Sequence, residues 1–117
     1  MDTAALLQRD SMEGIIKGFE QRIQGARQNP KIPKSKEIFY EIMKEYFERI
    51  YHAREQGKKL AWVGLLFPPE IILAMDIVPF VVEQYIIQLL ASGRGYEYFD
   101  LGEAYGFDKE SCSPHLA

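Results

Sequence analysis

Apolar residues recur every three or four positions in the first part of the chain, with polar residues between them. This spacing predicts an amphipathic helix within residues 1–30, because it places the apolar side chains on one helical face. Asp10 or Ser11 is the expected N-cap, and Asn29 followed by Pro30 ends the helix. The apolar positions are Met12, Ile15, Ile16, Phe19, Ile23 and Ala26.

A second and clearer helical pattern runs from Ser35 to Gly57. Ser35 is the expected N-cap, and Gly57 is the expected C′ residue beyond the last turn. The apolar stripe is wide, so we expect this helix to pack on something larger. Its apolar positions are Ile38, Phe39, Ile42, Met43, Tyr46, Phe47, Ile50 and Tyr51.

The pattern changes after Gly57. Residues 60–67 form a nearly continuous apolar run, which predicts a strand buried on both faces of a parallel sheet. Pro68-Pro69-Glu70 suits the start of a helix, since proline fits the first turn and an acid favours the positive end of the dipole. A short helix over 71–75 and a second strand over 76–83 complete a strand–helix–strand unit.

Two further helices are predicted over residues 84–91 and 96–105, the second ending at Gly106. The fold class is therefore α/β, with N-terminal helices followed by the start of a parallel sheet. We place the N-terminal helical region at residues 1–57 and the beginning of a first α/β domain, truncated within this chain, at residues 58–117.

Composition fits an ordinary globular protein. The chain has 117 residues, of which 47% are hydrophobic and 26% charged, and this balance supports a packed core. A net charge of −3 shows no basic excess, which argues against nucleic-acid binding. The apolar stretches 60–69 and 71–82 fall short of the ~20 residues of a membrane span. We expect a cytoplasmic protein without a membrane anchor.

The chain has a single cysteine, Cys112, so it cannot form an internal disulfide. A lone cysteine is usually a small buried apolar residue. His115 lies too close along the chain, and without an orienting acid, to be a convincing catalytic base for Cys112. The sequence contains no phosphate-binding GxxxxGK[ST] loop, no GxGxxG, no HExxH and no CxxC. Residues 111–117 read as the beginning of another helix, so we expect the natural protein to be longer.

The second half of the chain resembles the 2-hydroxyacyl-CoA dehydratase family, which includes the benzoyl-CoA reductase subunits. The resemblance covers roughly residues 58–117 and rests on the order of several short elements. A buried strand leads into Pro69-Glu70, a short helix containing Ala74 follows, and the next strand begins Ile77-Val78-Pro79-Phe80. Gly106-Phe107 and Ser111-Cys112-Ser113 then follow.

The resemblance implies a subunit built from two flavodoxin-like domains, with a 4Fe–4S cluster held between them by cysteine thiolates. In this family one electron passes to the thioester carbonyl of an acyl-CoA, and the resulting ketyl radical expels hydroxide. A separate ATP-hydrolysing iron–sulfur activator supplies the electron, and two related subunits form a heterodimer. A reductase of the benzoyl-CoA type, which eliminates nothing, is the alternative within the same fold.

The resemblance also implies roles for individual residues. Cys112 falls on the first cluster cysteine, and Ser113 follows it as in many members, where it can hydrogen-bond a cluster sulfur. Glu83 stands where members can carry a carboxylate beside the substrate, so we expect it to assist proton movement, although a solvent-facing glutamate is an equally good interpretation. Glu70 is better explained as a helix-start acid than as a catalyst, although it lies beyond the carboxyl end of the first strand, where ligands bind in open α/β sheets. Leu65 stands where some members carry a small polar residue near the substrate.

One departure from the family is large. A cluster in this family takes more than one cysteine from a subunit, and this chain has one. We therefore expect a fragment, a truncated product or one part of a split assembly, inactive alone. A non-catalytic α/β scaffold or interaction module, with the aromatic helix docking a partner, is the remaining hypothesis. The isolated chain should expose apolar strand edges and should aggregate or oligomerise.

Overall fold

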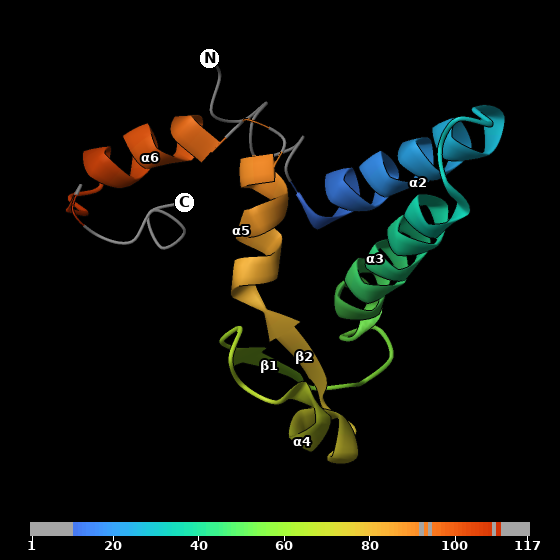
Figure 1. Ribbon diagram of the computed structural model, residues 1–117. Helices are drawn as coiled ribbons and strands as arrows, with labels where there is room; N and C mark the ends of the chain where they lie inside the picture. Colours follow the sequence, from blue (N-terminus) through green and yellow to red (C-terminus); the bar gives the residue numbers. More distant parts are fainter. Residues whose placement is uncertain (1–10, 92, 94, 109, 111–117) are drawn as a thin grey trace. The chain divides into compact units, whose positions relative to one another are not determined.

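The computed structural model describes residues 11–91, 93, 95–108 and 110. It divides into two compact units, with the boundary between Leu60 and Ala61. Figure 1 labels the helices and strands of the chain. The sequence places its division between Gly57 and Lys58, and the assignment of these segments to domains stays a prediction. In the part of the chain that is described, no helix is long and apolar enough to cross a membrane.

The first helix, α2, spans Met12–Gln28. Ser11 is its N-cap, and the Ser11 hydroxyl accepts a hydrogen bond of 3.2 Å from the backbone N–H of Gly14. This satisfies one of the amide donors that a helix leaves unpaired at its start. Of the two capping residues that the sequence offers, Ser11 is the one used, while Asp10 lies outside the described residues.

The second helix, α3, spans Lys34–His52, so both predicted ends are corrected. Pro33, and not Ser35, occupies the N-cap position, and no side chain caps this end. The helix stops before Gly57, because the backbone turns after Ala53 and the N–H of Lys58 donates to the carbonyl of Ala53 at 2.8 Å. Gly57 has the expected positive φ, 68°, but it lies within this following turn.

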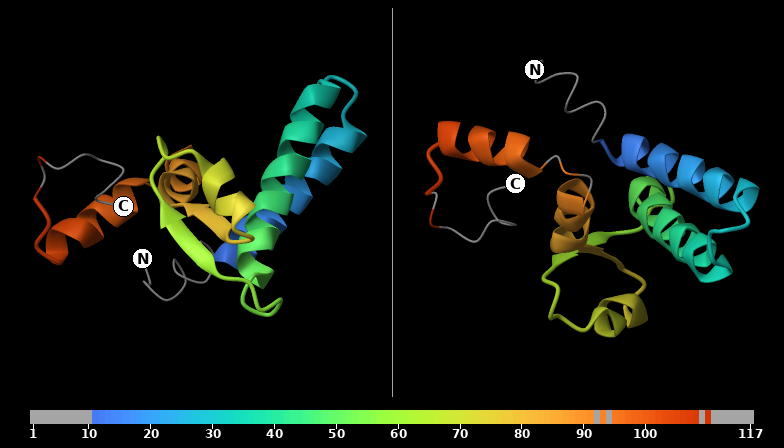
Figure 2. Two further views of the ribbon diagram at one scale, coloured as in Figure 1. Left: turned by 90° about the horizontal axis from the view of Figure 1, so that it is seen from below. Right: turned by 45° about the horizontal axis from the view of Figure 1, so that its top comes forward.

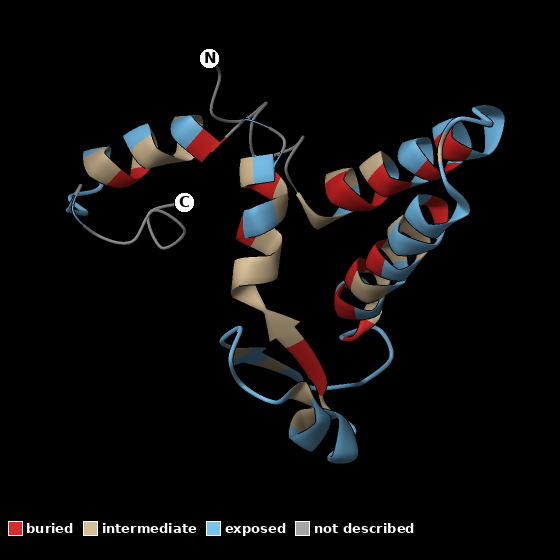
Figure 3. Ribbon diagram, viewed as in Figure 1, coloured by how far each residue is buried: buried red, intermediate tan, exposed pale blue. Residues whose placement is uncertain are grey.

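Helices α2 and α3 run antiparallel and pack against each other along their lengths (Figure 2). Phe19 and Phe47, which are 1% and 0% exposed, stack with ring centroids 5.9 Å apart. Residues coloured as buried face across the hairpin in Figure 3. The apolar residues buried in this unit are Ile15, Ile16, Phe19, Ile23, Ala26, Met43, Phe47, Ile50 and Ala53.

The second unit contains a parallel sheet of two strands. Strand β1 spans Leu60–Val63 and strand β2 spans Val78–Val81, with the short helix α4, Pro69–Ala74, in the crossover between them. The predicted strand–helix–strand order is confirmed, but both strands are shorter than expected. Helix α4 starts at Pro69 and not at Ile71, as proline at a first-turn position allows.

The prediction that β1 is buried on both faces is wrong for the described residues. Its residues alternate between exposed and half-buried, and Trp62 is 77% exposed. The strand ends before the apolar run does, because the chain turns at Gly64. The N–H of Phe67 donates to the carbonyl of Gly64 at 3.0 Å and closes this turn. With β2 as the single neighbouring strand described, much of the surface of β1 has nothing to cover it.

Strand β2 passes directly into helix α5, Val82–Ala91, and helix α6, Gly95–Ala104, follows it and contacts α5. Glu83 therefore lies in the first turn of α5, and the expectation that a strand extends to Glu83 is corrected. The described residues form a mixed α/β protein. A flavodoxin-like sheet stays a prediction, since it requires more parallel strands than the two described.

Candidate functional site

The carboxyl ends of the two parallel strands lie at one edge of the sheet. Gly64 follows the last residue of β1, and Glu83 follows β2 in the first turn of α5. A Cβ atom added at Gly64 would lie 3.6 Å from Oε1 of Glu83. The structure therefore brings the Glu83 carboxylate close to the backbone at the end of β1, the region where open α/β sheets bind ligands.

The second carboxylate oxygen of Glu83, Oε2, is buried and has no hydrogen-bond partner among the described residues. Leaving a buried acceptor without a donor costs about 1–3 kcal/mol. Such an atom in a native protein calls for an explanation, and binding or catalysis is one. The geometry thus gives Glu83 the character of a ligand-facing carboxylate.

Leu65 lies in the exposed turn that begins at Gly64. The same turn exposes Leu66 and Phe67, so its surface is strongly apolar. A pocket for an organic ligand typically combines apolar walls with a few polar groups. Leu65 and Glu83 are thus found at the same edge of the sheet.

Glu70 is exposed and lies in the first turn of α4, directly after Pro69. No hydrogen bond or ion pair of the described residues joins Glu70 to Glu83. An acid in this turn is stabilised by the positive end of the helix dipole. The geometry therefore supports the role of Glu70 as a helix-start acid and adds nothing toward substrate binding.

Cys112 and Ser113 lie outside the described residues. Within the described ranges, no group of three or more His, Cys, Asp or Glu side chains is arranged to hold a metal ion. Four cysteine thiolates are the usual ligand set of a 4Fe–4S cluster, and the sequence supplies one. The residues of this chain therefore do not fit such a cluster by themselves.

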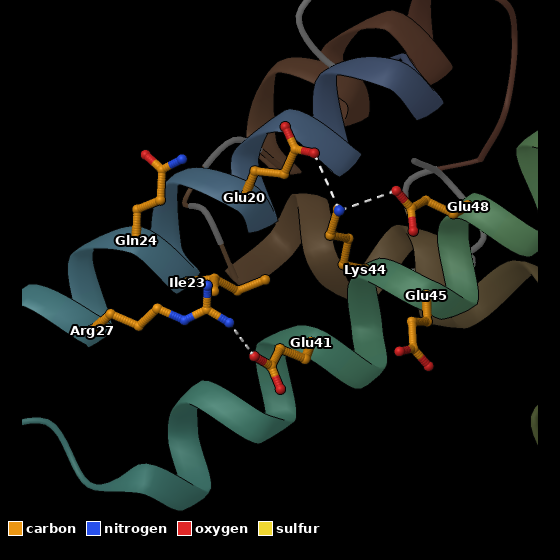
Figure 4. A pocket seen from close by; sticks show the side chains of 8 residues that line it. All are labelled: Glu20, Ile23, Gln24, Arg27, Glu41, Lys44, Glu45 and Glu48. Atoms are coloured by element: carbon orange, nitrogen blue, oxygen red, sulfur yellow. Dashed lines mark hydrogen bonds and ion pairs between the residues drawn. The ribbon is translucent and has the colours of Figure 1, made fainter.

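A pocket of about 500 Å³ lies between α2 and α3, and no sequence pattern predicted it. Four glutamates and two cations dominate its walls (Figure 4). Lys44 Nζ lies 3.2 Å from Glu20 and 3.1 Å from Glu48, and both ion pairs raise the pKa of Lys44. Arg27 pairs with Glu41 at 2.6 Å. Because Arg27 and Lys44 are already paired with glutamates of the protein, we interpret this pocket as the polar side of the helical hairpin and not as a ligand site.

Glu37 is buried at the closed end of the hairpin, with 8% of its side chain exposed. Lys34 Nζ donates to its Oε2 at 2.7 Å, and Arg27 Nε donates to its Oε1 at 2.8 Å. These two hydrogen bonds, the Lys34 bond first, hold the pKa of Glu37 below its usual value. No local sequence pattern predicts this cluster, because Arg27 and Glu37 come together only through the turn that joins the helices.

Gly64 was also missed, although it carried a readable signal. A single glycine inside an apolar strand pattern indicates a bulge or a close approach of the backbone to another group. The pattern Trp62-Val63-Gly64-Leu65 has this form. The group that approaches is the carboxylate of Glu83, from a segment much later in the sequence.

Comparison with known proteins finds a distant relative for part of the chain. No protein-family model and no solved structure matches the chain. The chain is similar to the (R)-phenyllactyl-CoA dehydratase alpha subunit of Clostridium sporogenes, with 28% identity over 79 residues. The match covers 68% of this chain and 19% of the relative, so the chain spans about a fifth of that protein. The similarity agrees with the resemblance seen in the sequence.

Proposed function

We propose that this chain forms part of a subunit of a 2-hydroxyacyl-CoA dehydratase. The observation that carries the proposal is the similarity to the (R)-phenyllactyl-CoA dehydratase alpha subunit. The position of Glu83 supports it independently, since a buried oxygen without a hydrogen-bond donor stands at the ligand-binding edge of a parallel sheet. The reaction removes water from a 2-hydroxyacyl-CoA and leaves a carbon–carbon double bond.

In this proposal Glu83 handles a proton at the acyl chain. Dehydration takes hydroxide from C2 and a proton from C3, and the two combine as water. The Glu83 carboxylate accepts the C3 proton, and the resulting carboxylic acid passes it to the departing hydroxide, which leaves as water and restores the carboxylate. A positioned acid–base group of this kind contributes about 10²–10⁴-fold to a rate.

The electron-transfer part of the family chemistry requires more than this chain. We propose Cys112 as one thiolate ligand of the cluster in the assembled enzyme, with the other ligands supplied from outside these 117 residues. A paralogous second subunit and an ATP-dependent iron–sulfur activator complete the assembly. The relative is itself named as an alpha subunit, which supports a heteromeric enzyme.

The role of Glu83 is tested by Glu83→Gln in the assembled enzyme with its activator and ATP. This change keeps the shape and removes the proton acceptor, so kcat should fall about 100-fold or more while the product stays the same. Glu45→Gln is the control, because Glu45 is exposed on α3 in the other unit. An unchanged kcat in Glu83→Gln would remove Glu83 from the mechanism.

The ligand role of Cys112 has a separate test. Anaerobic reconstitution of the assembled protein with iron and sulfide should produce the visible absorbance of a cluster. Cys112→Ala should lower or abolish that absorbance, and Cys112→Ser should retain part of it, because a serine oxygen can replace a thiolate only poorly. Full absorbance in Cys112→Ala contradicts the assignment, whatever the substrate of the enzyme.

A further inference from the structure

The glycine at position 64 is not required by the backbone. The described glycines with a positive φ are Gly57, Gly93 and Gly106, so Gly64 adopts a conformation open to any residue. Nor is it required by crowding, because an added Cβ would meet Glu83 Oε1 at 3.6 Å, an ordinary van der Waals contact, and nothing else within 4 Å. The atom that lies against the missing side chain is Oε1 of Glu83, while Oε2 of the same carboxylate is buried.

We propose that Gly64 is a specificity-determining residue that keeps the Glu83 carboxylate open to the ligand. A side chain at position 64 would stand against Oε1 and take the space through which a ligand approaches. The inference rests on the proposed function, in which Glu83 acts on the acyl chain. It goes further by assigning access to that carboxylate to a residue with no functional group of its own.

The surroundings define the chemistry of the ligand that enters. Oε2 of Glu83 is buried and lacks a donor, so it favours a ligand that brings a hydrogen-bond donor or an acidic C–H. The turn that starts at Gly64 exposes Leu66 almost completely, at 97%, with Leu65 and Phe67 on either side. An apolar acyl group bearing one polar or acidic position matches both features.

The direct test measures how easily reagents reach Glu83 in the purified chain. Carboxylates are coupled to an amine with a water-soluble carbodiimide, and mass spectrometry of peptides gives the labelling rate at each glutamate. In the wild-type chain Glu83 should react. Gly64→Ala should slow labelling of Glu83 several-fold, and Gly64→Val should slow it further, with labelling of Glu70 unchanged in both.

Gly25→Ala is the matched control, since a Cβ there has nothing within 4 Å. It should leave the labelling of Glu83 at the wild-type rate. Thermal unfolding shows whether each variant is folded, and Gly64→Ala should keep or slightly raise the Tm, because alanine restricts the unfolded chain. Equal labelling of Glu83 in wild type and Gly64→Ala, or no labelling of Glu83 in the wild type, overturns the inference.

Activity of the assembled enzyme gives the second arm. Gly64→Ala should lower kcat/KM for acyl-CoA substrates by about tenfold or more, the usual effect of one methyl group in a fitted pocket. The loss should be smaller for substrates with small acyl groups than for bulky ones. If no dehydration occurs at all, the proposed function fails while the labelling result still decides whether Gly64 controls access to Glu83.

Discussion

At the scale of single residues, the buried carboxylate of Glu37 links α3 to α2 through hydrogen bonds. It is the charged side chain buried within the described part of the chain, and it accepts hydrogen bonds from both Arg27 and Lys34. Arg27 also pairs with Glu41, so Arg27 of α2 shares one network with Lys34, Glu37 and Glu41 of α3. A buried carboxylate is tolerated only when its oxygens are satisfied in this way.

Removing the charge of Glu37 should therefore weaken the hairpin. Glu37→Gln loses the charge-assisted bonds from Lys34 and Arg27 while keeping nearly the same shape, so the Tm of the chain should fall at pH 7. Glu45→Gln, on the exposed side of α3, should leave the Tm unchanged. Differential scanning calorimetry measures the Tm of both variants. Equal Tm values for Glu37→Gln and Glu45→Gln would mean that the Glu37 network does not stabilise the fold.

The same residue predicts a pH dependence with a definite sign. The folded-state pKa of Glu37 lies below the ordinary value of 4.5. Its stabilisation is therefore fully present above pH 4.5 and is lost as the pH falls through the lowered folded pKa. The difference in Tm between wild type and Glu37→Gln should stay constant from pH 7 to about pH 5. It should then shrink below pH 4, and a constant difference down to pH 3 would contradict this.

The sequence predicts the roles of residues that act within one element, but not contacts between residues that are distant along the chain. Ser11 as an N-cap and the positive φ of Gly57 follow from local rules. The burial of Glu37 and the approach of Glu83 to Gly64 depend on segments meeting in space, which local patterns do not contain. The proposed roles of Cys112, Ser113, Glu70 and Leu65 stay predictions, since they depend on an assembly larger than this chain.

At the scale of elements, the sequence pattern predicted which segments are helices and both ends of α2, but it misplaced the ends of α3 and the start of α4. Helix α3 uses only part of its apolar stripe against α2, and Ile38, Phe39 and Ile42 remain exposed. The apolar run after Leu60 gave a strand, yet the turn at Gly64 ended it early. Periodicity reports how much apolar surface an element carries, whereas burial depends on what is present to cover it.

The two serines near helix starts give a paired prediction. Ser11→Ala removes the bond from the Gly14 N–H and should cost about 1 kcal/mol of stability. Ser35→Ala should cost little, because Pro33 holds the N-cap position of α3 and Ser35 lies inside the helix. Urea titration followed by circular dichroism measures both. A larger loss in Ser35→Ala than in Ser11→Ala would contradict the cap assignment.

The aromatic residues of α3 give a second pair. Phe47→Ala should destabilise the hairpin by about 3–5 kcal/mol, since Phe47 is fully buried and stacks on Phe19. Phe39→Ala should cost about 1 kcal/mol or less, because Phe39 is 50% exposed. Chemical denaturation of each variant gives the two values. Equal losses would indicate that the outer face of α3 is also covered in solution.

At the scale of the whole molecule, the two units differ in how completely they bury their apolar residues. The α2–α3 hairpin buries nine apolar residues, although Ile38, Phe39 and Ile42 stay exposed. The described part of the sheet unit buries Val78, Ile86 and Leu89 and leaves Trp62, Leu65, Leu66, Ile71 and Met75 exposed. A sheet with uncovered strand edges and a large apolar surface invites association. This agrees with a chain that contributes one part of a larger enzyme.

Trp62, the single tryptophan of the chain, reports on that surface. In dilute solution its fluorescence should be that of a water-exposed indole, because 77% of the residue is exposed. As the concentration rises, emission should shift to shorter wavelength while the mass measured by light scattering increases. Leu66→Ser should weaken this association. A monomer with unchanged emission at every concentration would contradict the prediction.

The central claim is that this chain belongs to an enzyme that dehydrates 2-hydroxyacyl-CoA thioesters. The most direct measurement supplies the assembled protein, its activator and ATP with a panel of 2-hydroxyacyl-CoA substrates, phenyllactyl-CoA included, and follows the products by mass spectrometry. We predict a product lighter than the substrate by one water, formed only when activator and ATP are both present. A product heavier by two hydrogens would indicate a reductase of the benzoyl-CoA type, and no conversion of any thioester would favour a non-catalytic scaffold; either result contradicts the claim.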